Sequence, residues 1–214
     1  MLTVWGRRSS SNVQAVMWCI AELGLACERI DAGQRYGVID TPAFRAMNPN
    51  GTIPVLRDGD GEPLWESAAI LRYLAGRYAA PPFWPAEGMA RAQVDKWAEW
   101  AKINVTIGFT HPIFWKLVRT APADRDVAAI DQAVARLDQT LAIAEAQLAR
   151  HRCLAGEDFT LADIQFGHLL YRYFDIPITR ANYPALRRYY EDLTTRPAYR
   201  EHVMVSYEEL RVTA

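Results

Sequence analysis

Residues 48 to 56 read NPNGTIPVL, a turn-forming segment followed by a short apolar run. Asparagine, proline and glycine fill the first four positions, and tight turns favour these residues. Pro63-Leu64-Trp65 is a second run, and Asp58-Gly59-Asp60-Gly61 lies between the two. Two short apolar runs around such a turn predict a β-hairpin, with Ile53 to Leu56 as its first strand.

Before the hairpin, the chain alternates between strand and helix patterns. Leu2 to Trp5 is an apolar run that ends at Gly6, and it predicts a buried strand. Gly24 marks the end of a helix whose apolar residues recur at helical spacing: Val13, Val16, Met17, Ile20 and Leu23. Cys27 to Ile30 predicts a second strand, parallel to the first because a helix connects them.

Two further helices complete this first unit. Thr41-Pro42 is a cap followed by proline at the first helical position, and it opens a short helix through Met47. Glu66-Ser67 opens another, with apolar residues at Ile70, Leu71, Tyr73 and Leu74. Residues 1–78 therefore predict the order β-α-β-α-β-β-α, a small α/β domain.

The composition then changes. Residues 79–88, AAPPFWPAEG, hold three prolines and a glycine and predict a linker. No strand pattern follows, so residues 89–214 are expected to form an all-α domain. Thr160 and Asp163 form a capping box before a strongly apolar helix, which we interpret as purely structural and worth about 1 kcal/mol.

Charge and cysteine content exclude several classes of function. The 214 residues have a formal net charge of −1, from 24 basic and 25 acidic residues. This argues against nucleic-acid binding, which needs a basic face. No run approaches the roughly 20 apolar residues of a membrane helix, and MLTVWGRRSS lacks a signal-peptide pattern. Cys19, Cys27 and Cys153 do not have metal-ligand spacing, so we expect no metal site and a reduced, cytoplasmic protein.

The order of elements resembles that of the cytosolic glutathione S-transferases over essentially the whole chain, in particular their bacterial, serine-type members of the theta- or nu-like kind. Four motifs carry the resemblance: Ser10-Ser11-Asn12, Asn48 to Leu56, Glu66-Ser67, and Phe159 to Ile164. It implies a thioredoxin-like N-terminal domain that binds glutathione, an all-α C-terminal domain, and a homodimer. Glutathione would be the co-substrate, with no other cofactor.

The same resemblance implies how glutathione binds. A cis bond before Pro54 would leave the Ile53 backbone groups free to pair with a peptide ligand. Glu66 and Ser67 begin a helix, where free N–H groups suit the carboxylate of a γ-glutamyl moiety and Glu66 can pair with its ammonium group. Ala68 stands where the family usually has a basic residue, so backbone groups or a more distant arginine would replace it.

A second implication concerns the serines in residues 7–17, RRSSSNVQAVM. Thioredoxin-like redox enzymes have Cys-x-x-Cys at this turn, whereas this chain has none, so the thiol would come from glutathione. Counting six positions back from Val16, as in serine-type members, gives Ser10 as the hydrogen-bond donor to the thiolate. Asn12 ranks second and Ser11 third. In the alternative interpretation all four polar residues are loop and cap, with Asn12 or Ser11 capping the helix.

The resemblance further implies that the second substrate binds against the first helices of the helical domain. That stretch is rich in aromatic residues, and Gly108 and Pro112 would bend or open a long helix there. The candidate pocket residues are Asn104, Gly108, His111 and Trp115. Alternatively, the aromatic residues are mostly core, and His111 is a surface or capping residue.

These features predict a detoxifying glutathione S-transferase that conjugates glutathione to a small hydrophobic electrophile. On the same fold, a glutathione-dependent disulfide reductase, peroxidase or isomerase is the runner-up. A non-catalytic ligand-binding or interaction protein is the alternative of another class. The combination of Ser10, Ile53-Pro54, Glu66 and Ser67 argues against it, because a carrier has no need for a thiol-activating group beside the tripeptide anchors.

Overall fold

The computed structural model describes residues 1–213, and its first part is built on one mixed sheet. The strands are β1 (Leu2–Trp5), β2 (Cys27–Ile30), β3 (Val55–Asp58) and β4 (Leu64–Trp65), in the order β2-β1-β3-β4. β1 pairs in parallel with β2 and antiparallel with β3, and β3 and β4 form an antiparallel hairpin. The predicted parallel pair and hairpin are both confirmed.

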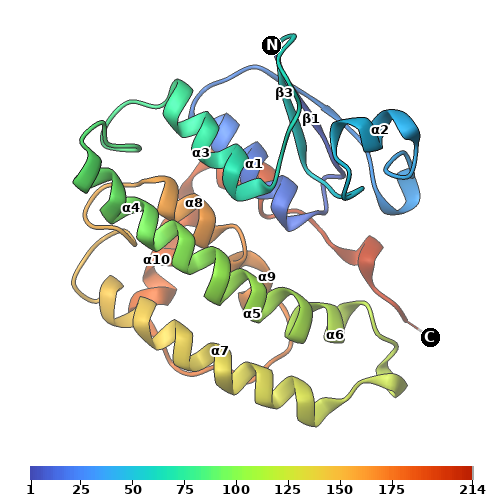
Figure 1. Cartoon of the computed structure of the whole chain (residues 1–214). Coiled ribbons are helices and arrows are strands. Elements are labelled where there is room, and N and C mark those ends of the chain that lie inside the picture. The colour runs from blue at the N-terminus through green and yellow to red at the C-terminus, as the bar shows by residue number, and fades with distance from the viewer. Residues whose placement is uncertain (214) are drawn as a thin grey trace.

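Helices cover both faces of this sheet (Figure 1). They are α1 (Ser11–Glu22), α2 (Pro42–Met47) and α3 (Ser67–Tyr78), with a short 3-10 turn η1 (Gln34–Tyr36) before α2. Because side chains alternate along a strand, Leu56 joins the main core with α1 and α3, while Val55 packs with Phe44 of α2. The fold is thus the expected thioredoxin-like α/β arrangement.

The second part contains one long helical rod that crosses the front of Figure 1. It consists of α4 (Gly88–Trp100), η2 (Ala101–Thr106), α5 (Ile107–Phe109), η3 (Thr110–Trp115) and α6 (Lys116–Val118). η2 and η3 are wider π-helical turns, which are frequent at functional sites. The helix is therefore opened at Pro112, which lies in η3, whereas Gly108 lies in the α-helical segment α5 between the two turns.

The remaining helices follow the rod along the chain. They are η4 (Pro122–Asp124), α7 (Val127–Leu148), α8 (Leu161–Gly167), α9 (Leu170–Asp175), α10 (Pro184–Thr195), α11 (Pro197–His202) and η5 (Glu208–Leu210). Within residues 79–213 no strand is present beyond a single bridge between Cys153 and Gly156. In the described part of the chain, no helix is both long and apolar enough to cross a membrane.

Asp163 has a larger role than a helix cap. The predicted capping box with Thr160 is present, and the Thr160 backbone amide donates to the carboxylate at 2.7 Å. The same carboxylate also accepts from the backbone amide of Leu154 at 2.9 Å and from the hydroxyl of Tyr189 at 2.8 Å. Asp163 therefore joins α8 to the preceding loop and to α10, in the interior of the molecule.

We expect Asp163→Ala to lower the free energy of unfolding by about 3 kcal/mol or more, because it leaves several buried donors unpaired. Asp158→Ala is the matched control, since Asp158 is exposed five residues earlier, and its effect should stay within about 0.5 kcal/mol. Chemical denaturation measures both. A loss of only about 1 kcal/mol for Asp163→Ala would show that the carboxylate is no more than a cap.

Candidate active site

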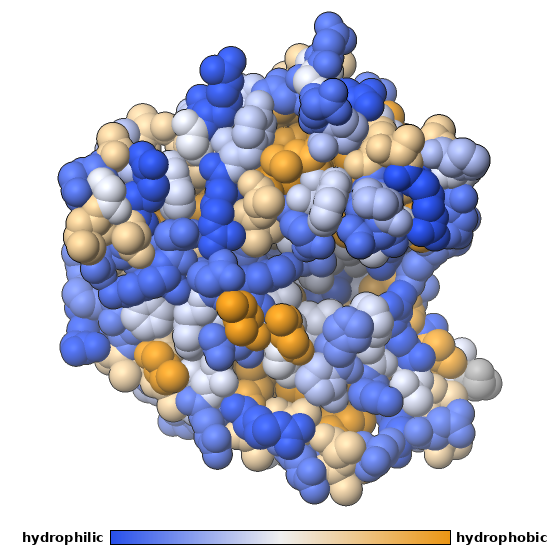
Figure 2. All heavy atoms as spheres, viewed as in Figure 1, coloured by the Kyte–Doolittle hydropathy of each residue, from blue (hydrophilic) through white to orange (hydrophobic). Residues whose placement is uncertain are grey.

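A pocket of about 380 Å³ lies between the two parts of the molecule. The wall formed by the sheet-bearing part consists of the loop after β1, the loop before α2 and the turn before β3. The opposite wall consists of η3 and the residues around it, and Leu210 of η5 closes one side. The space-filling view in Figure 2 shows the surface hollowed between the sheet-bearing part and the long helix.

Ser10, Ser11 and Asn12 all line this pocket. Ser10 is the N-cap residue of α1, and its backbone amide and carbonyl bond to Arg7 and Gln14. The Ser10 side chain makes no capping hydrogen bond, and neither Ser11 nor Asn12 occupies the cap position. The alternative in which Ser11 or Asn12 caps the helix is therefore wrong, and the Ser10 hydroxyl remains available to a ligand.

Ser9 has a different role from its neighbours. Its hydroxyl donates to the carboxylate of Glu209, which also forms an ion pair with Arg35 at 2.9 Å. Its carbonyl accepts from the guanidinium of Arg172 at 2.6 Å. Ser9 thus ties the loop after β1 to α9 and to the C-terminal segment.

The backbone around Pro54 has the geometry that the resemblance implies. The Ile53–Pro54 bond is cis, as expected. Ile53 lines the pocket, and within residues 1–213 its amide and carbonyl form no backbone hydrogen bond. A peptide ligand can therefore pair with Ile53 in the manner of an added strand.

Glu66 and Ser67 lie at the start of α3, as the sequence predicts. Glu66 is exposed and has φ of 68°, a left-handed conformation that costs free energy in a residue other than glycine and is often found at binding sites. Ser67 is buried, and its hydroxyl donates to Asn12 Oδ1 at 3.2 Å. The starts of α1 and α3 are therefore joined directly by side chains.

Lys102 completes this contact, and the sequence analysis missed it. Its ammonium group, in η2, lies 3.1 Å from Ser67 Oγ and 3.2 Å from Asn12 Oδ1. Burial lowers the pKa of Lys102, while the carboxylates of Glu66 and Glu99 act in the opposite direction. One signal was present in the sequence, because Lys102 is the only lysine or arginine between Trp97 and Trp115.

Of the residues proposed to contact the second substrate, His111 and Trp115 line the pocket, with ring centroids 3.8 Å apart. Asn104 and Gly108 do not line it. Asn104 is exposed and donates to the Trp100 carbonyl, and the nearest atom to a Cβ on Gly108 would belong to Leu137 of α7. A π-helical turn contains more residues than an α-helical turn, so it changes the direction in which the following side chains leave the helix. Residues seven apart along the rod therefore no longer share one face.

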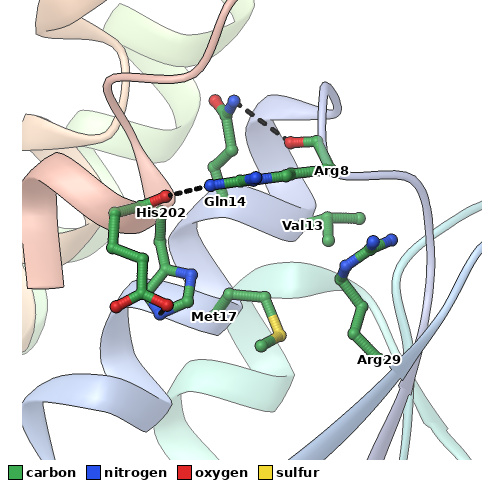
Figure 3. Close-up of a pocket in the computed structure, with 7 residues that line it drawn as sticks. Arg8, Val13, Gln14, Met17, Arg29 and His202 are labelled. Atoms are coloured by element: carbon green, nitrogen blue, oxygen red, sulfur yellow. Dashed lines mark hydrogen bonds and ion pairs between the residues drawn. The ribbon is translucent and has the colours of Figure 1, made fainter.

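Arg7 and Arg8 point to opposite sides of the loop. Arg7 lines the pocket. Arg8 lines a separate cavity of about 230 Å³ beside α11, where its guanidinium donates to the Glu201 carbonyl at 3.0 Å (Figure 3). Figure 3 also shows Gln14 donating to the Arg8 carbonyl, which fixes the direction of the loop. Two arginines from elsewhere, Arg119 and Arg172, join Arg7 in lining the pocket.

The three cysteines do not belong to the site, because none lines the pocket. Burial raises the pKa of the Cys19 thiol, and it raises those of Cys27 and Cys153 to about 11 and about 12. All three thiols are therefore protonated near neutral pH and poorly nucleophilic. Among residues 1–213, no cluster of three or more histidine, cysteine, aspartate or glutamate side chains could hold a metal ion.

Comparison with known proteins identifies the family. The family model for the glutathione S-transferase N-terminal domain matches residues 1–76, and that for the C-terminal domain matches residues 106–197. The chain is 41% identical over 207 residues to glutathione S-transferase GstB of Escherichia coli K12, covering 96% of this chain and 99% of that one. Glutathione S-transferase 3 of Zea mays is 34% identical over 213 residues, covering 94% of this chain and 93% of the relative.

A solved structure agrees with these matches. The theta-class glutathione S-transferase of Xanthomonas axonopodis pv. citri with glutathione bound superimposes with a TM-score of 0.90 at 43% sequence identity, covering 96% of this chain and 98% of that one. The chain therefore belongs to the glutathione S-transferase family, and its class of activity is that of a glutathione transferase.

Proposed function

We propose that this protein binds glutathione in the pocket between its two parts and transfers it, as the thiolate, to a small electrophile. The observation that carries the proposal is Ser10, which lines the pocket at the N-terminus of α1 and whose hydroxyl makes no capping bond. A glutathione whose cysteine pairs with Ile53 would place its sulfur near this hydroxyl. The positive end of the α1 dipole would add to the effect.

The size of this effect is sufficient for activation. A free thiol has a pKa near 8.5, so only a small fraction is thiolate at neutral pH. A hydrogen bond to a charged group contributes about 1.5–3 kcal/mol, and one pKa unit corresponds to about 1.4 kcal/mol. Ser10 would therefore lower the thiol pKa by about one to two units. Serine is too weak an acid to act as the base, so its role is that of a donor.

Asn12 would assist Ser10 through its amide nitrogen. Its Oδ1 already accepts from both Ser67 and Lys102, and these two bonds fix the orientation of the side chain. The NH₂ group is then left to donate toward the sulfur. Ser11, the first residue of α1, is the remaining candidate donor, since it also lines the pocket.

The γ-glutamyl end of glutathione would bind at the start of α3. The free N–H groups of the helix suit its carboxylate, and Ser67 holds the ammonium group of Lys102 beside them by accepting its hydrogen bond. The exposed carboxylate of Glu66 suits the ammonium group of the ligand. Lys102 supplies the positive charge that is missing at Ala68, because its ammonium group already lies within hydrogen-bonding distance of Ser67 Oγ. In this proposal a residue of the long helix, rather than an arginine, replaces the missing basic side chain.

The other activities on this fold, disulfide reduction, peroxidase and isomerase chemistry, would use the same bound thiolate. The cysteines of the chain favour the transferase. Cys19 is buried, and the pKa values of Cys27 and Cys153 are raised, so none of the three supplies a second reactive thiol. We propose a detoxifying role in the cytoplasm. The location in the cytoplasm is supported by the three cysteines, all of which are free thiols, as is usual in a reducing compartment.

Ser10→Ala should raise the midpoint pH for ionisation of bound glutathione by about one to two units, because the donor to the thiolate is lost. The thiolate absorbance of the complex, titrated against pH, measures this midpoint. Ser11→Ala is the matched control and should leave the midpoint unchanged. An unchanged midpoint in Ser10→Ala, with a raised one in Ser11→Ala, would move the assignment to Ser11.

Lys102→Met should weaken glutathione binding by about tenfold or more, because a charge-assisted hydrogen bond to the γ-glutamyl carboxylate is lost. Lys96→Met, at an exposed site on α4, is the control for loss of one positive charge. Calorimetry should also show that a glutathione analogue lacking that carboxylate binds parent and Lys102→Met equally. If the variant weakens both ligands alike, Lys102 acts through the structure and not on the carboxylate.

We also propose that the protein is a homodimer that uses the outer side of the long helix. Ile103 and Ile107 are one helical turn apart and are 52% and 58% exposed, and apolar residues gather on this part of the rod in Figure 2. Exposed apolar patches of this kind often mark protein interfaces.

Light scattering should therefore give a solution mass of twice the 24.2 kDa of one chain, and Ile103→Glu should shift it toward one chain. Ile143→Glu is the matched control for a charge at an exposed isoleucine, because Ile143 is 50% exposed on α7 and not on the rod. A monomeric parent, or a dimer that Ile103→Glu leaves intact, would exclude this interface.

A further inference from the structure

Three arginines from distant parts of the chain face the same pocket. Arg7 follows β1, Arg119 follows α6, and Arg172 belongs to α9. Arg7 and Arg119 are half-buried, and Arg172 is almost completely buried. The side chains that line the pocket include no aspartate or glutamate. The pocket that was expected to be hydrophobic is therefore distinctly cationic on the side away from α3.

None of these cations forms an ion pair within the described chain, although the charge of Glu209 partly offsets that of Arg7. Among residues 1–213, no ion pair involves Arg7, Arg119 or Arg172, and the buried Nε atoms of Arg7 and Arg172 lack a hydrogen-bond partner. Glu209 lies nearby, but its carboxylate is engaged by Ser9 and Arg35. Buried charges without a counter-charge are costly, and proteins normally pair them or bind a ligand of opposite charge there.

Mutual repulsion contributes to the lowered pKa values of two of the three groups, Arg7 and Arg172. Burial, and secondarily the charge of Arg119, lowers the pKa of Arg7. Burial, followed by the charges of Arg7 and then Arg119, lowers the pKa of Arg172 to about 10. All three nevertheless stay protonated at neutral pH, so an anion bound between them would relieve the repulsion.

Glutathione alone does not account for this charge. Its γ-glutamyl carboxylate would lie at Ser67 and Lys102, on the other side of Asn12. Its glycyl carboxylate would lie on the sheet side, where Arg7 is close to Gly33. Gly33 has no Cβ, and one added there would lie only 3.3 Å from Arg7 Nη1. The guanidinium of Arg7 therefore lies close against this residue. Arg119 lies instead on the helical wall, with its guanidinium 4.4 Å from the ring centroid of Trp115.

The three arginines also differ in how firmly they are held. Arg172 donates to the Ser9 carbonyl and to Gln14 Oε1, and it stacks on Phe114, so its main role is to hold the loop. Arg119 makes no side-chain hydrogen bond within residues 1–213 and rests only on the face of Trp115. Its guanidinium is therefore free to form a bidentate pair with an incoming carboxylate.

We propose that the electrophile of this transferase carries a carboxylate, which Arg119 binds, while Trp115 and Leu210 pack against its carbon frame. The inference rests on the proposed function and makes it more specific, because it replaces a hydrophobic electrophile by an anionic one. Arg7 and Arg172 contribute to the positive field of the site.

The test uses two matched electrophiles, 4-chloro-3-nitrobenzoate and the neutral 4-chloro-3-nitrobenzamide, together with their glutathione conjugates. In the reaction, the sulfur electron pair forms an S–C bond at the carbon that bears chlorine. The C–Cl bond then breaks and chloride leaves with its electron pair, while the thiol proton has already passed to solvent. Binding of the two conjugates by calorimetry tests the charge preference even where turnover is slow.

Arg119→Gln should lower the affinity for the carboxylate conjugate, and kcat/KM for the benzoate, by about tenfold or more. The amide conjugate and the benzamide should change less than about twofold. Arg119→Lys should recover part of the loss, and Lys116→Gln, which removes an exposed charge of the same helix, should behave as the parent.

Three results would overturn the proposal. Equal losses for both conjugates would show that Arg119 acts on the fold or on the thiolate. A raised KM for glutathione with both electrophiles unaffected would place the glycyl carboxylate at Arg119. A parent that binds the amide conjugate as tightly as the carboxylate conjugate would show that the pocket does not select anions.

Failure of the proposed function gives a different result from each of these. In that case glutathione itself would not ionise on binding to the parent, whatever the electrophile. Thiolate absorbance, recorded before any electrophile is added, separates the two failures.

Discussion

The buried guanidinium of Arg172 is the contact on which the active site depends. It enters from α9 and donates to the carbonyl of Ser9, 163 residues earlier in the chain, and to the side chain of Gln14. Hydrogen-bond acceptors stabilise a buried cation, and the two acceptors here belong to the loop after β1 and to the first turn of α1. Satisfying Arg172 therefore fixes the loop that carries the serines. The orientation of the Ser10 peptide group follows from that of Ser9.

Other contacts across the molecule act in the same direction. Ser9 bonds to Glu209, and Lys102 of the long helix bonds to Asn12 and Ser67. The site is thus assembled from segments that are 35 to 200 residues apart in sequence. Neither part forms it alone, because the sheet part supplies the hydroxyl and peptide groups and the helical part supplies most of the charge.

This division explains what the sequence could and could not predict. The hairpin, the parallel strand pair and the capping box at Thr160 depend on local chemistry, and all are confirmed. The cis bond before Pro54 is also confirmed, but only the family resemblance implied it. The role of Lys102 and the opposite directions of Arg7 and Arg8 depend on long-range packing, which no local pattern encodes. Asn104 and Gly108 lie outside the pocket because the prediction assumed a regular α-helix. The two π-helical turns change the direction in which the side chains leave it.

The three consecutive serines are not redundant, because each has a different environment. Ser9 binds Glu209 of the C-terminal segment, and Ser11 is the first residue of α1. Ser10 occupies the N-cap position, but its hydroxyl makes no capping hydrogen bond. One hydroxyl donor is also well matched to the chemistry. A thiolate gains population as its pKa falls, but its intrinsic nucleophilicity falls too, so the best attacking thiol has a pKa near the ambient pH. A shift of about one to two units from 8.5 meets that condition. A full positive charge in direct contact with sulfur would stabilise the thiolate further at the expense of its reactivity. The arginines are therefore better used on the far wall, where they can bind the electrophile.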